Sequence, residues 1–464
     1  METSYANQSF LVLGAGVTGN SIAHALLRRG AKVHIVDENP HAKSKFTILP
    51  PEKVQITNYN TLVISPGWNE KHPLIASAVD AGLELQNEID IAWHISRQIS
   101  PSQKWLALTG TNGKTTTVEM AAAMMQSAGL KAMACGNVGD TVISAVDRSD
   151  TFDYLVLELS SFQLHWIKDA EFVSAAILNI ADDHLDWHGS FENYCRDKFK
   201  ILERAHLGIF NAEDEEVFAR AQKWPGHKVF FTLQTPGPGE LGVVENLLVD
   251  RAFVADAQEA EMIASITDIQ PTLPHSVSNA LAAAGLARSV GVPYEKIQSA
   301  LRDFHPGRHR IETIHVSNGV SWINDSKATN PHAAAASIMS HLSVIWIAGG
   351  LAKGADMELL VARCASRIKV AILIGADREL IEAAFVKYSP KTHRIMVDPD
   401  SDYIKGAPSN SLMEKIVHTA QSLASSGDTI LMAPACASMD QFIDYADRGD
   451  RFAEAVRKLV THGK

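Results

Sequence analysis

The segment 109-TGTNGKTTT-117 contains the residues best suited to bind phosphate. It lies between a strand-like run at 104–110 and a helical run at 116–129. In that setting backbone N–H groups can hold a phosphate, Lys114 can neutralise its charge, and the Thr115 hydroxyl can reach Mg²⁺. The match to the common phosphate loop is incomplete, because leucine replaces its first glycine. The segment predicts ATP binding, with a bare turn as the alternative.

A second glycine-rich turn, 14-GAGVTG-19, fits the pattern G-x-G-x-x-G. It joins a strand-like run at 9–14 to a helical run at 19–30, so backbone N–H groups could approach a diphosphate there. Asp37 ends the next strand-like run, 31–37, where dinucleotide-binding folds place a ribose-binding acid. The pattern indicates a nucleotide or diphosphate site. A tight packing turn, with Asp37 as a simple cap, is the alternative.

Several charged residues follow or end other apolar runs. Glu158 ends the run 155–159, where a carboxylate is costly unless it is paired or metal-bound. The run 182-DDH-184 follows 174–180 and is suited to metal or phosphate contact. By themselves, Glu158 could be salt-bridged or solvated and His184 could be structural. Lys198, in the helical stretch 192–202, by itself indicates only a solvated lysine.

Strand-like and helical runs alternate along the chain, which predicts an α/β fold with mostly parallel sheets. Its 464 residues suggest two to four domains. We place boundaries near 98–103 and 305–310, giving blocks 1–100, 101–306 and 307–464. The third block contains strand-like runs at 320–326, 343–350, 369–375 and 428–434. The segment 234–242 is expected to be a loop.

Composition narrows the class of protein. Lys plus Arg is 42 and Asp plus Glu is 53, a net charge of −11, which argues against non-specific nucleic-acid binding. The apolar runs are much shorter than the roughly 20 residues that span a bilayer. The first residues do not resemble a signal peptide. The four cysteines are scattered, so we expect reduced thiols in a cytoplasmic protein.

Motifs along nearly the whole chain resemble the Mur ligase and folylpolyglutamate synthetase superfamily. They are GTNGKTT and the segments 157-LELSSFQL-164, 182-DDHLDWHG-189, 194-YCRDKFKI-201, 307-GRHRIE-312, 322-WINDSKATNP-331, 349-GGLAKGADM-357 and 433-APACASMDQF-442. The resemblance implies an N-terminal Rossmann-like domain that binds a UDP-substrate, a central P-loop-type ATPase α/β domain, and a C-terminal Rossmann-like domain that binds an amino acid.

The resemblance is closest to the D-glutamate-adding branch of the family. It implies ATP-dependent joining of D-glutamate to UDP-N-acetylmuramoyl-L-alanine through an acyl phosphate, in cytoplasmic peptidoglycan precursor synthesis. ATP and Mg²⁺ are the implied cofactors. A monomer is expected, without nucleic-acid partners or membrane insertion. The sequence does not distinguish D- from L-glutamate.

The resemblance also assigns roles to matching positions. For ATP they are Gly110, Thr111, Asn112, Gly113, Lys114, Thr115, Thr116, Asn279, Arg310 and Asp325. For Mg²⁺ they are Thr115, Glu158, His184 and Lys198, the last as a carbamate, and the catalytic set is Lys114, Lys198 and His184. The UDP-substrate residues are Val17, Thr18, Asp37, Ser65 and Asn137. The amino-acid residues are Lys327, Thr329, Lys353, Ser438 and Tyr445.

Other interpretations remain open at this point. Asn279 could be a helix-surface amide, Arg310 an interdomain salt bridge and Asp325 a cap. The turn at 14–19 with Asp37 would suit a nicotinamide-dependent oxidoreductase, but the ATP loop and Glu158 have no role in hydride transfer. A non-enzymatic nucleotide-binding regulator would leave Lys198 unexplained. A neighbouring ligase of the superfamily is the remaining alternative.

Overall fold

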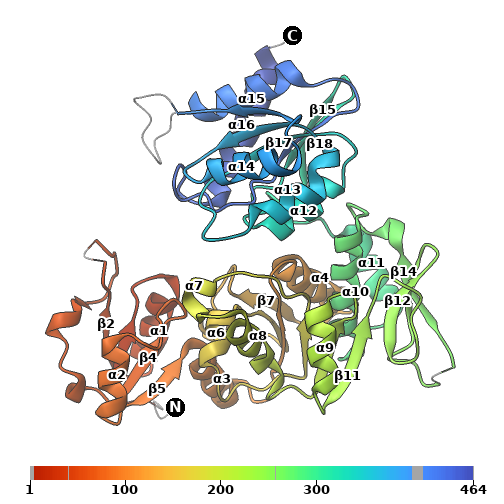
Figure 1. The fold of residues 1–464 in the computed structure, drawn as a ribbon. Coiled ribbons are helices and arrows are strands. Elements are labelled where there is room, and N and C mark those ends of the chain that lie inside the picture. The colour runs from red at the N-terminus through yellow and green to blue at the C-terminus, as the bar shows by residue number, and fades with distance from the viewer. Residues whose placement is uncertain (1–4, 40, 257, 400–410, 463–464) are drawn as a thin grey trace. The chain divides into compact units, whose positions relative to one another are not determined.

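The computed structural model describes residues 5–39, 41–256, 258–399 and 411–462. The chain divides into two compact units, each described by itself below. Unit 1 comprises Met1–Ile180 and Leu185–Phe304, and unit 2 comprises Ala181–His184 and His305–Lys464. In both units helices alternate with strands along the chain, and the strands form mainly parallel sheets (Figure 1). The predicted α/β class is therefore confirmed.

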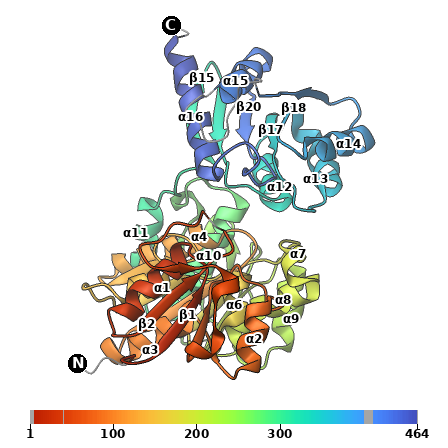
Figure 2. The ribbon, with the colours of Figure 1, turned by 90° about the vertical axis from the view of Figure 1, so that its left-hand side faces the viewer.

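The first sheet of unit 1 is parallel, with strand order β3-β2-β1-β4-β5. Its strands are β1 (Ser9–Leu13), β2 (Lys32–Val36), β3 (Ile48–Leu49), β4 (Thr61–Ile64) and β5 (Glu84–Asn87). The helices are α1 (Val17–Leu27), α2 (Pro73–Asp80) and α3 (Glu88–Ile99), with short 3₁₀ turns at Pro51–Lys53 and Ile56–Asn58. Helix α1, which lies beside β1 and β2 (Figure 2), starts and ends earlier than the predicted range 19–30.

The second sheet of unit 1 has the order β14-β13-β12-β11-β10-β9-β6-β8-β7. It is parallel except where β13 pairs with β12 and β14. Its strands are β6 (Lys104–Thr109), β7 (Ala132–Gly136), β8 (Tyr154–Glu158), β9 (Ser174–Ile177), β10 (Leu207–Asn211), β11 (His227–Phe231), β12 (Glu240–Val244), β13 (Leu247–Asp250) and β14 (Glu261–Ser265). Strand β12 begins at Glu240, inside the predicted loop 234–242, so the predicted loop extends too far at its C-terminal end.

Helices cover this second sheet and carry much of the candidate site. They are α4 (Lys114–Ser127), α5 (Val142–Val146), α6 (Ser161–Trp166), α7 (Leu185–His188), α8 (Phe191–Phe199), α9 (Glu215–Lys223), α10 (Pro274–Arg288) and α11 (Tyr294–Asp303), with 3₁₀ turns at Lys200–Leu202 and Ile266–Asp268. Helices α4 and α10 pack against each other and bury an alanine-rich surface. Small side chains allow such close approach, so α10 reaches the start of α4.

Unit 2 contains one sheet with the order β15-β16-β20-β17-β18-β19, antiparallel only between β15 and β16. The strands are β15 (Glu312–Ser317), β16 (Val320–Asn324), β17 (Val344–Gly349), β18 (Ile368–Ile374), β19 (His393–Met396) and β20 (Thr429–Met432). The helices are α12 (Pro331–Met339), α13 (Met357–Cys364), α14 (Arg378–Tyr388), α15 (Ser411–Leu423) and α16 (Tyr445–His462), with a 3₁₀ turn at Ala365–Arg367.

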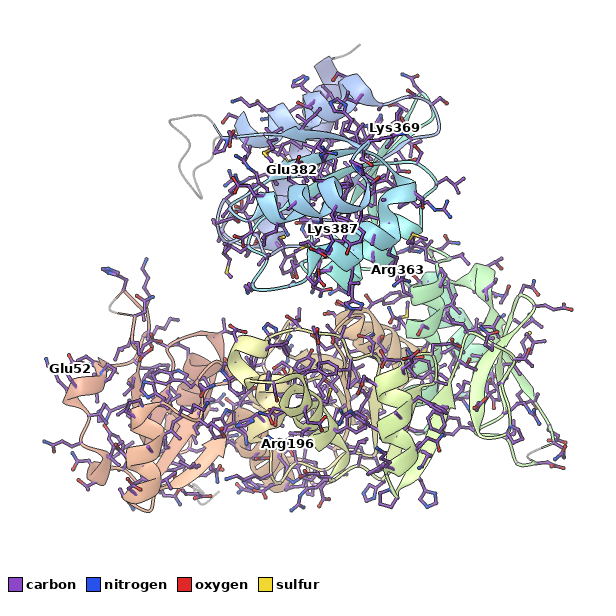
Figure 3. The ribbon with its side chains drawn as sticks, in the orientation of Figure 1. Glu52, Arg196, Arg363, Lys369, Glu382 and Lys387 are labelled. Carbon is purple, nitrogen blue, oxygen red and sulfur yellow. The ribbon has the colours of Figure 1, made fainter. Side chains whose placement is uncertain are left out.

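Charged side chains lie on the outside of unit 2, while its central strands β17, β18 and β20 are mainly apolar and buried. Lys387 of α14 pairs with Glu358 of α13, and Arg394 of β19 donates to Glu382 at 3.0 Å; Lys387 and Glu382 are labelled in Figure 3. All four cysteines of the chain are buried and free of disulfides, as expected. Within the described ranges, no helix combines the length and apolar character needed to cross a membrane.

Candidate active site

The loop after β6 has the geometry of a phosphate cradle. Gly113 is the residue before α4 and has φ +83°, a left-handed conformation that suits glycine. The ammonium of Lys114 curls over the loop and donates to the carbonyls of Gly110 and Thr111, at 2.9 Å each. The buried Thr115 is the second residue of α4. Strand, loop and helix therefore follow one another as the sequence predicted.

Neighbouring amides fix the shape of this loop. The Asn179 side chain accepts from the Asn112 backbone N–H at 2.7 Å and donates to the Asn112 carbonyl at 3.0 Å. A Cβ atom placed on Gly113 would overlap the Asn279 side-chain oxygen, so α10 delivers this amide directly to the loop. Asn279 is therefore not a helix-surface amide. Asn179 was not anticipated, because its effect depends on two strands meeting side by side.

Lys198 lies buried beside the loop. It is 2% exposed, and its Nζ donates to the Gly110 carbonyl at 2.8 Å and to the Thr109 hydroxyl at 3.4 Å. The Tyr194 ring centroid lies 4.8 Å from the same nitrogen, and the Tyr194 hydroxyl meets Thr111 at 3.0 Å. The solvated-lysine alternative is wrong, because α8 turns this side chain inward toward β6.

Glu158 ends β8 with an unusual environment for a carboxylate. It is 2% exposed, and its Oε1 accepts from the Asn137 side chain at 3.0 Å. Its Oε2 is buried, and no described residue supplies it with a hydrogen bond. Burying a carboxylate oxygen without a donor is costly, so this atom is available to a cation. Neither the salt-bridged nor the solvated alternative holds among the described residues.

A buried network that the sequence analysis missed adjoins Lys198. Asp197 Oδ2 accepts from Nδ1 of both His165 and His188, at 2.9 Å each, and His188 Nε2 meets the Ser161 hydroxyl at 2.9 Å. Burial would raise the pKa of Asp197, but the two histidine hydrogen bonds and the charges of His165 and Lys200 hold it well below its usual range. The network joins α6, α7 and α8.

The turn at 14–19 forms a second polar site in unit 1. The Ala15 backbone N–H donates to Asp37 Oδ2 at 2.6 Å, so Asp37 does cap this turn. A Cβ on Gly19 would overlap the Gly14 carbonyl, which explains the last glycine. Ser65, after β4, has a buried hydroxyl without a hydrogen-bond partner among the described residues. Val17 and Thr18 open α1, and the Val17 side chain is exposed.

Unit 2 brings Arg310 and Asp325 together. Asp325 follows β16 and is 7% exposed, and its carboxylate accepts from the Ile311 N–H at 3.3 Å. Burial raises its pKa to about 6, against the opposing effects of that hydrogen bond and the Arg310 charge. The carboxylate therefore also has the role of a local cap, one of the alternatives considered for it.

The residues predicted for the amino acid surround the carboxyl ends of β16, β17 and β20. Lys327 Nζ lies 3.5 Å from the Tyr445 hydroxyl and 5.0 Å from the Tyr445 ring centroid. Lys353 is exposed and has φ +50°, a conformation that costs a non-glycine residue free energy and is typical of functional loops. Ser438 is buried. Thr329 donates its backbone N–H to the Lys327 carbonyl at 2.9 Å.

Arg448, which sequence reasoning missed, ties these loops together. Its guanidinium is fully buried and donates to Ser326 (hydroxyl and carbonyl, 2.9 Å each), to the Cys436 carbonyl (3.2 Å) and to the Gly349 carbonyl (3.5 Å). Among the described residues it forms no ion pair with a carboxylate. Burial lowers its pKa to about 10. The segment 445-YADRGDRF-452 contains two arginines, and the sequence alone does not show which of them is buried.

His184 groups with unit 2, whereas Glu158 and Lys198 belong to unit 1. It has φ +54°, and its Nε2 lies 3.6 Å from the Asp183 carboxylate. In the part of the chain that the structure describes, no three His, Cys, Asp or Glu side chains gather as a metal site. Unit 1 thus joins Lys114, Asn279, Lys198, Glu158 and Asn137, and unit 2 joins the residues from Arg310 to Tyr445.

Comparison with known proteins identifies the family to which the chain belongs. The family model described as "Mur ligase middle domain" matches residues 108–287. "Mur ligase, glutamate ligase domain" matches 309–436, and "Mur ligase MurD-like, N-terminal domain" matches 8–87. The three matches follow one another in the order that the sequence motifs suggested.

A curated relative from Streptomyces avermitilis, named UDP-N-acetylmuramoylalanine--D-glutamate ligase, is 44% identical over 98% of this chain and 99% of its own. Among solved structures, a pseudomurein peptide ligase type C from Methanothermus fervidus aligns with TM-score 0.60 and 20% identity, over 98% of this chain and 100% of that one. MurF ligase from Thermotoga maritima, in complex with ADP, aligns with TM-score 0.59 and 16% identity, over 100% and 97%. By matches across nearly its whole length, this chain belongs to the Mur ligase family.

Proposed function

We propose that the chain is an ATP-dependent ligase that joins D-glutamate to UDP-N-acetylmuramoyl-L-alanine, a step of peptidoglycan precursor synthesis. The observation that carries the proposal is the 44% identity, over almost both full chains, to a ligase of that name. The phosphate cradle supports ATP as the energy source. The buried lysine beside it has no role in a bare nucleotide-binding module.

The reaction brings anions together. A substrate carboxylate oxygen attacks the γ-phosphorus of ATP and ADP leaves, giving an acyl phosphate; the amine of glutamate then attacks the acyl carbon, and phosphate leaves as the amide forms. Cations must screen the carboxylate from the triphosphate in the first step. We assign this to Lys114, which would exchange its loop carbonyls for phosphate oxygens, while Gly110–Thr116 hold the phosphates by their backbone N–H groups.

We assign the remaining ATP contacts to Asn279 at the base, Arg310 at phosphate and Asp325 at the ribose. Asn279 already touches the loop, and a planar guanidinium suits phosphate. Arg310 and Asp325 belong to unit 2, whereas the phosphate loop and Asn279 belong to unit 1.

The residues present fit a magnesium ion, because Glu158 Oε2 is a buried carboxylate oxygen without a donor. We propose that Glu158, the Thr115 hydroxyl, His184 and a carbamate on Lys198 hold it. The ion would supply positive charge beside the phosphates. The carbamate forms when the neutral Lys198 amine adds CO₂ and releases a proton, which converts a cation into a carboxylate.

For the UDP-substrate we propose Val17, Thr18, Asp37, Ser65 and Asn137. The start of α1 offers backbone N–H groups to the diphosphate. The Ser65 hydroxyl, buried without a described partner, is a group that a ligand could satisfy. Asn137 donates to Glu158, so it would link the sugar end of this substrate to the metal site.

For glutamate we propose Lys327, Thr329, Lys353, Ser438 and Tyr445. Its carboxylates need fixed cationic and hydroxyl donors, and unit 2 gathers these at one end of its sheet. Arg448 touches the backbones of three loops that carry them, so we propose it as a positioning residue. Under this assignment, blocks 1–100, 101–306 and 307–464 bind the UDP-substrate, ATP and glutamate. We propose that the protein acts as a cytoplasmic monomer without nucleic-acid partners.

Phosphate release from ATP tests the function. We expect release to require UDP-N-acetylmuramoyl-L-alanine and D-glutamate together, with L-glutamate measured in parallel. Release that needs neither substrate, or that needs folate and glutamate, would contradict the proposal. Lys114→Ala should abolish the coupled release. Lys223→Ala, which removes an exposed lysine of α9, should retain it.

A further inference from the structure

Unit 1 has a solvent-open cavity of about 710 Å³ away from the residues assigned above. Its walls are one face of α1, the segment 43–46 and helix α5. Helix α1 contributes Asn20, Ser21 and His24, and Arg28 directly after the helix continues the same face. The cavity therefore lies where the first sheet's helix meets a helix of the second sheet.

The lining of this cavity, which we call the α1–α5 cavity, is cationic. Arg28, Lys43 and Lys45 line it, with His24 beside them and Asp147 as the single lining carboxylate. Lys43 and Lys45 make no hydrogen bond or ion pair with any described residue, and both side chains are exposed. In a chain of net charge −11, such a local excess of positive charge attracts anions.

The negative charge of Asp147 does not cancel the positive charge of the cavity lining, because Arg29, which is not part of the lining, also pairs with Asp147. Its carboxylate is 10% exposed and accepts from Arg29 at 2.7 Å and from Arg28 at 3.0 Å. The Arg29 side chain is 16% exposed and also donates to the Ala25 carbonyl, so it is fixed in place. Arg28 is 59% exposed and can turn to a ligand while Arg29 keeps Asp147 neutralised.

The α1–α5 cavity and a hollow that adjoins it differ in charge. The adjoining hollow of about 420 Å³ shares Arg28 and Asp147 but adds Arg148, Ser149 and Asp150. There Arg148 pairs with Asp150 and Asp140, so the hollow is neutralised. Elsewhere the cavity lining includes the half-buried Phe46, next in sequence to Lys45, which has no described ion-pair partner. An anionic group thus belongs near Lys43 and Lys45, and an apolar group belongs against Phe46.

We propose that the α1–α5 cavity binds a small organic phosphate. Arg28 would supply a guanidinium fork for the phosphate, Lys43 and Lys45 would supply point charges, and Ser21 could add a hydroxyl. None of the residues assigned to ATP, the UDP-substrate or glutamate lines this cavity. The ligand would span α1 and α5 and so brace the two sheets of unit 1 against each other.

The test is a titration of the full-length chain with phenyl phosphate or with inorganic phosphate. Binding is monitored through the proton NMR resonances of His24. That imidazole lines the cavity and is 62% exposed, and its signals are identified by their loss in His24→Gln. The background variant is Lys114→Ala, which weakens the separate phosphate loop. We expect a saturable shift, with phenyl phosphate binding more tightly than inorganic phosphate because its ring can contact the half-buried Phe46.

Adding Lys43→Ser and Lys45→Ser should weaken binding by about fivefold or more, the range expected for exposed charge pairs. The matched control adds Lys32→Ser and Lys53→Ser, which removes the same charge from exposed sites of the same sheet region. Equal weakening by both pairs, a shift that does not saturate, or equal binding of the two probes would overturn the proposal. Because no ligase turnover is measured, the result is independent of the proposed function.

Discussion

Glu88, the first residue of α3, should make the stability of unit 1 depend on pH. Its carboxylate is 2% exposed, and Oε1 accepts from the Ile143 N–H at 3.0 Å. Oε2 is buried without a hydrogen-bond partner among the described residues. Burial raises the pKa of Glu88 from 4.5 to about 7, although the Ile143 hydrogen bond opposes the rise. Near pH 5 the folded protein therefore holds a proton that the unfolded chain releases.

The sign follows from proton linkage. Because the folded pKa is the higher one, the contribution to stability is complete below pH 4.5 and is lost as the pH rises through about 7. At about 1.36 kcal/mol per pKa unit, the full range is about 3 kcal/mol, and about 2.5 kcal/mol of it falls between pH 5 and 8. Glu88→Gln keeps the neutral form at every pH and removes this dependence.

Urea unfolding at pH 5 and pH 8, followed by tryptophan fluorescence, measures the effect. At each pH the quantity to compare is the free energy of unfolding of Glu88→Gln minus that of the parent. This difference should be about 2.5 kcal/mol more favourable to the variant at pH 8 than at pH 5. Glu84→Gln, an exposed carboxylate on the preceding strand, is the control and should show the same difference at both pH values. An equal difference at both pH values for Glu88→Gln would refute the reasoning.

Three further predictions concern the site. Lys198→Ala should abolish turnover, with partial recovery on adding a short carboxylic acid; normal turnover without it would contradict the carbamate assignment. Gly113→Ala should raise the KM for ATP at least about tenfold, because a φ of +83° costs alanine about 1–2 kcal/mol and the new Cβ would overlap Asn279. The control is Gly129→Ala, which has a similar φ of +78° but open space around it. It should change only the thermal stability. Arg448→Lys should raise the KM for glutamate more than the KM for ATP, because one ammonium nitrogen cannot replace three guanidinium nitrogens that donate to Ser326, Gly349 and Cys436. Equal changes in both KM values would argue for general destabilisation.

Local patterns were enough to predict the α/β class and both glycine-rich turns. A short apolar run followed by glycines and a helix is a contiguous signal, since neighbouring residues fix the turn. Element ends were less predictable: α1 begins at Val17 rather than at residue 19, and β12 begins inside the expected loop 234–242. The start of α1 is set by the backbone turn at Gly16, and that of β12 by pairing with β11 and β13, neither of which hydrophobic periodicity reveals.

The sequence by itself determined the family, the phosphate loop around Lys114 and the residue types able to hold anions. Only the tertiary structure decided which of those residues are buried together. Lys198 is an ordinary helical lysine in sequence, yet in the fold its side chain is buried and reaches Thr109 and Gly110 at the end of β6. Arg448 and Asp197 gave no local signal, because their side-chain hydrogen-bond partners are 12 to 122 and 9 to 32 residues away. Burial and pairing are properties of segments that meet across the fold, so a local reading of the chain cannot supply them.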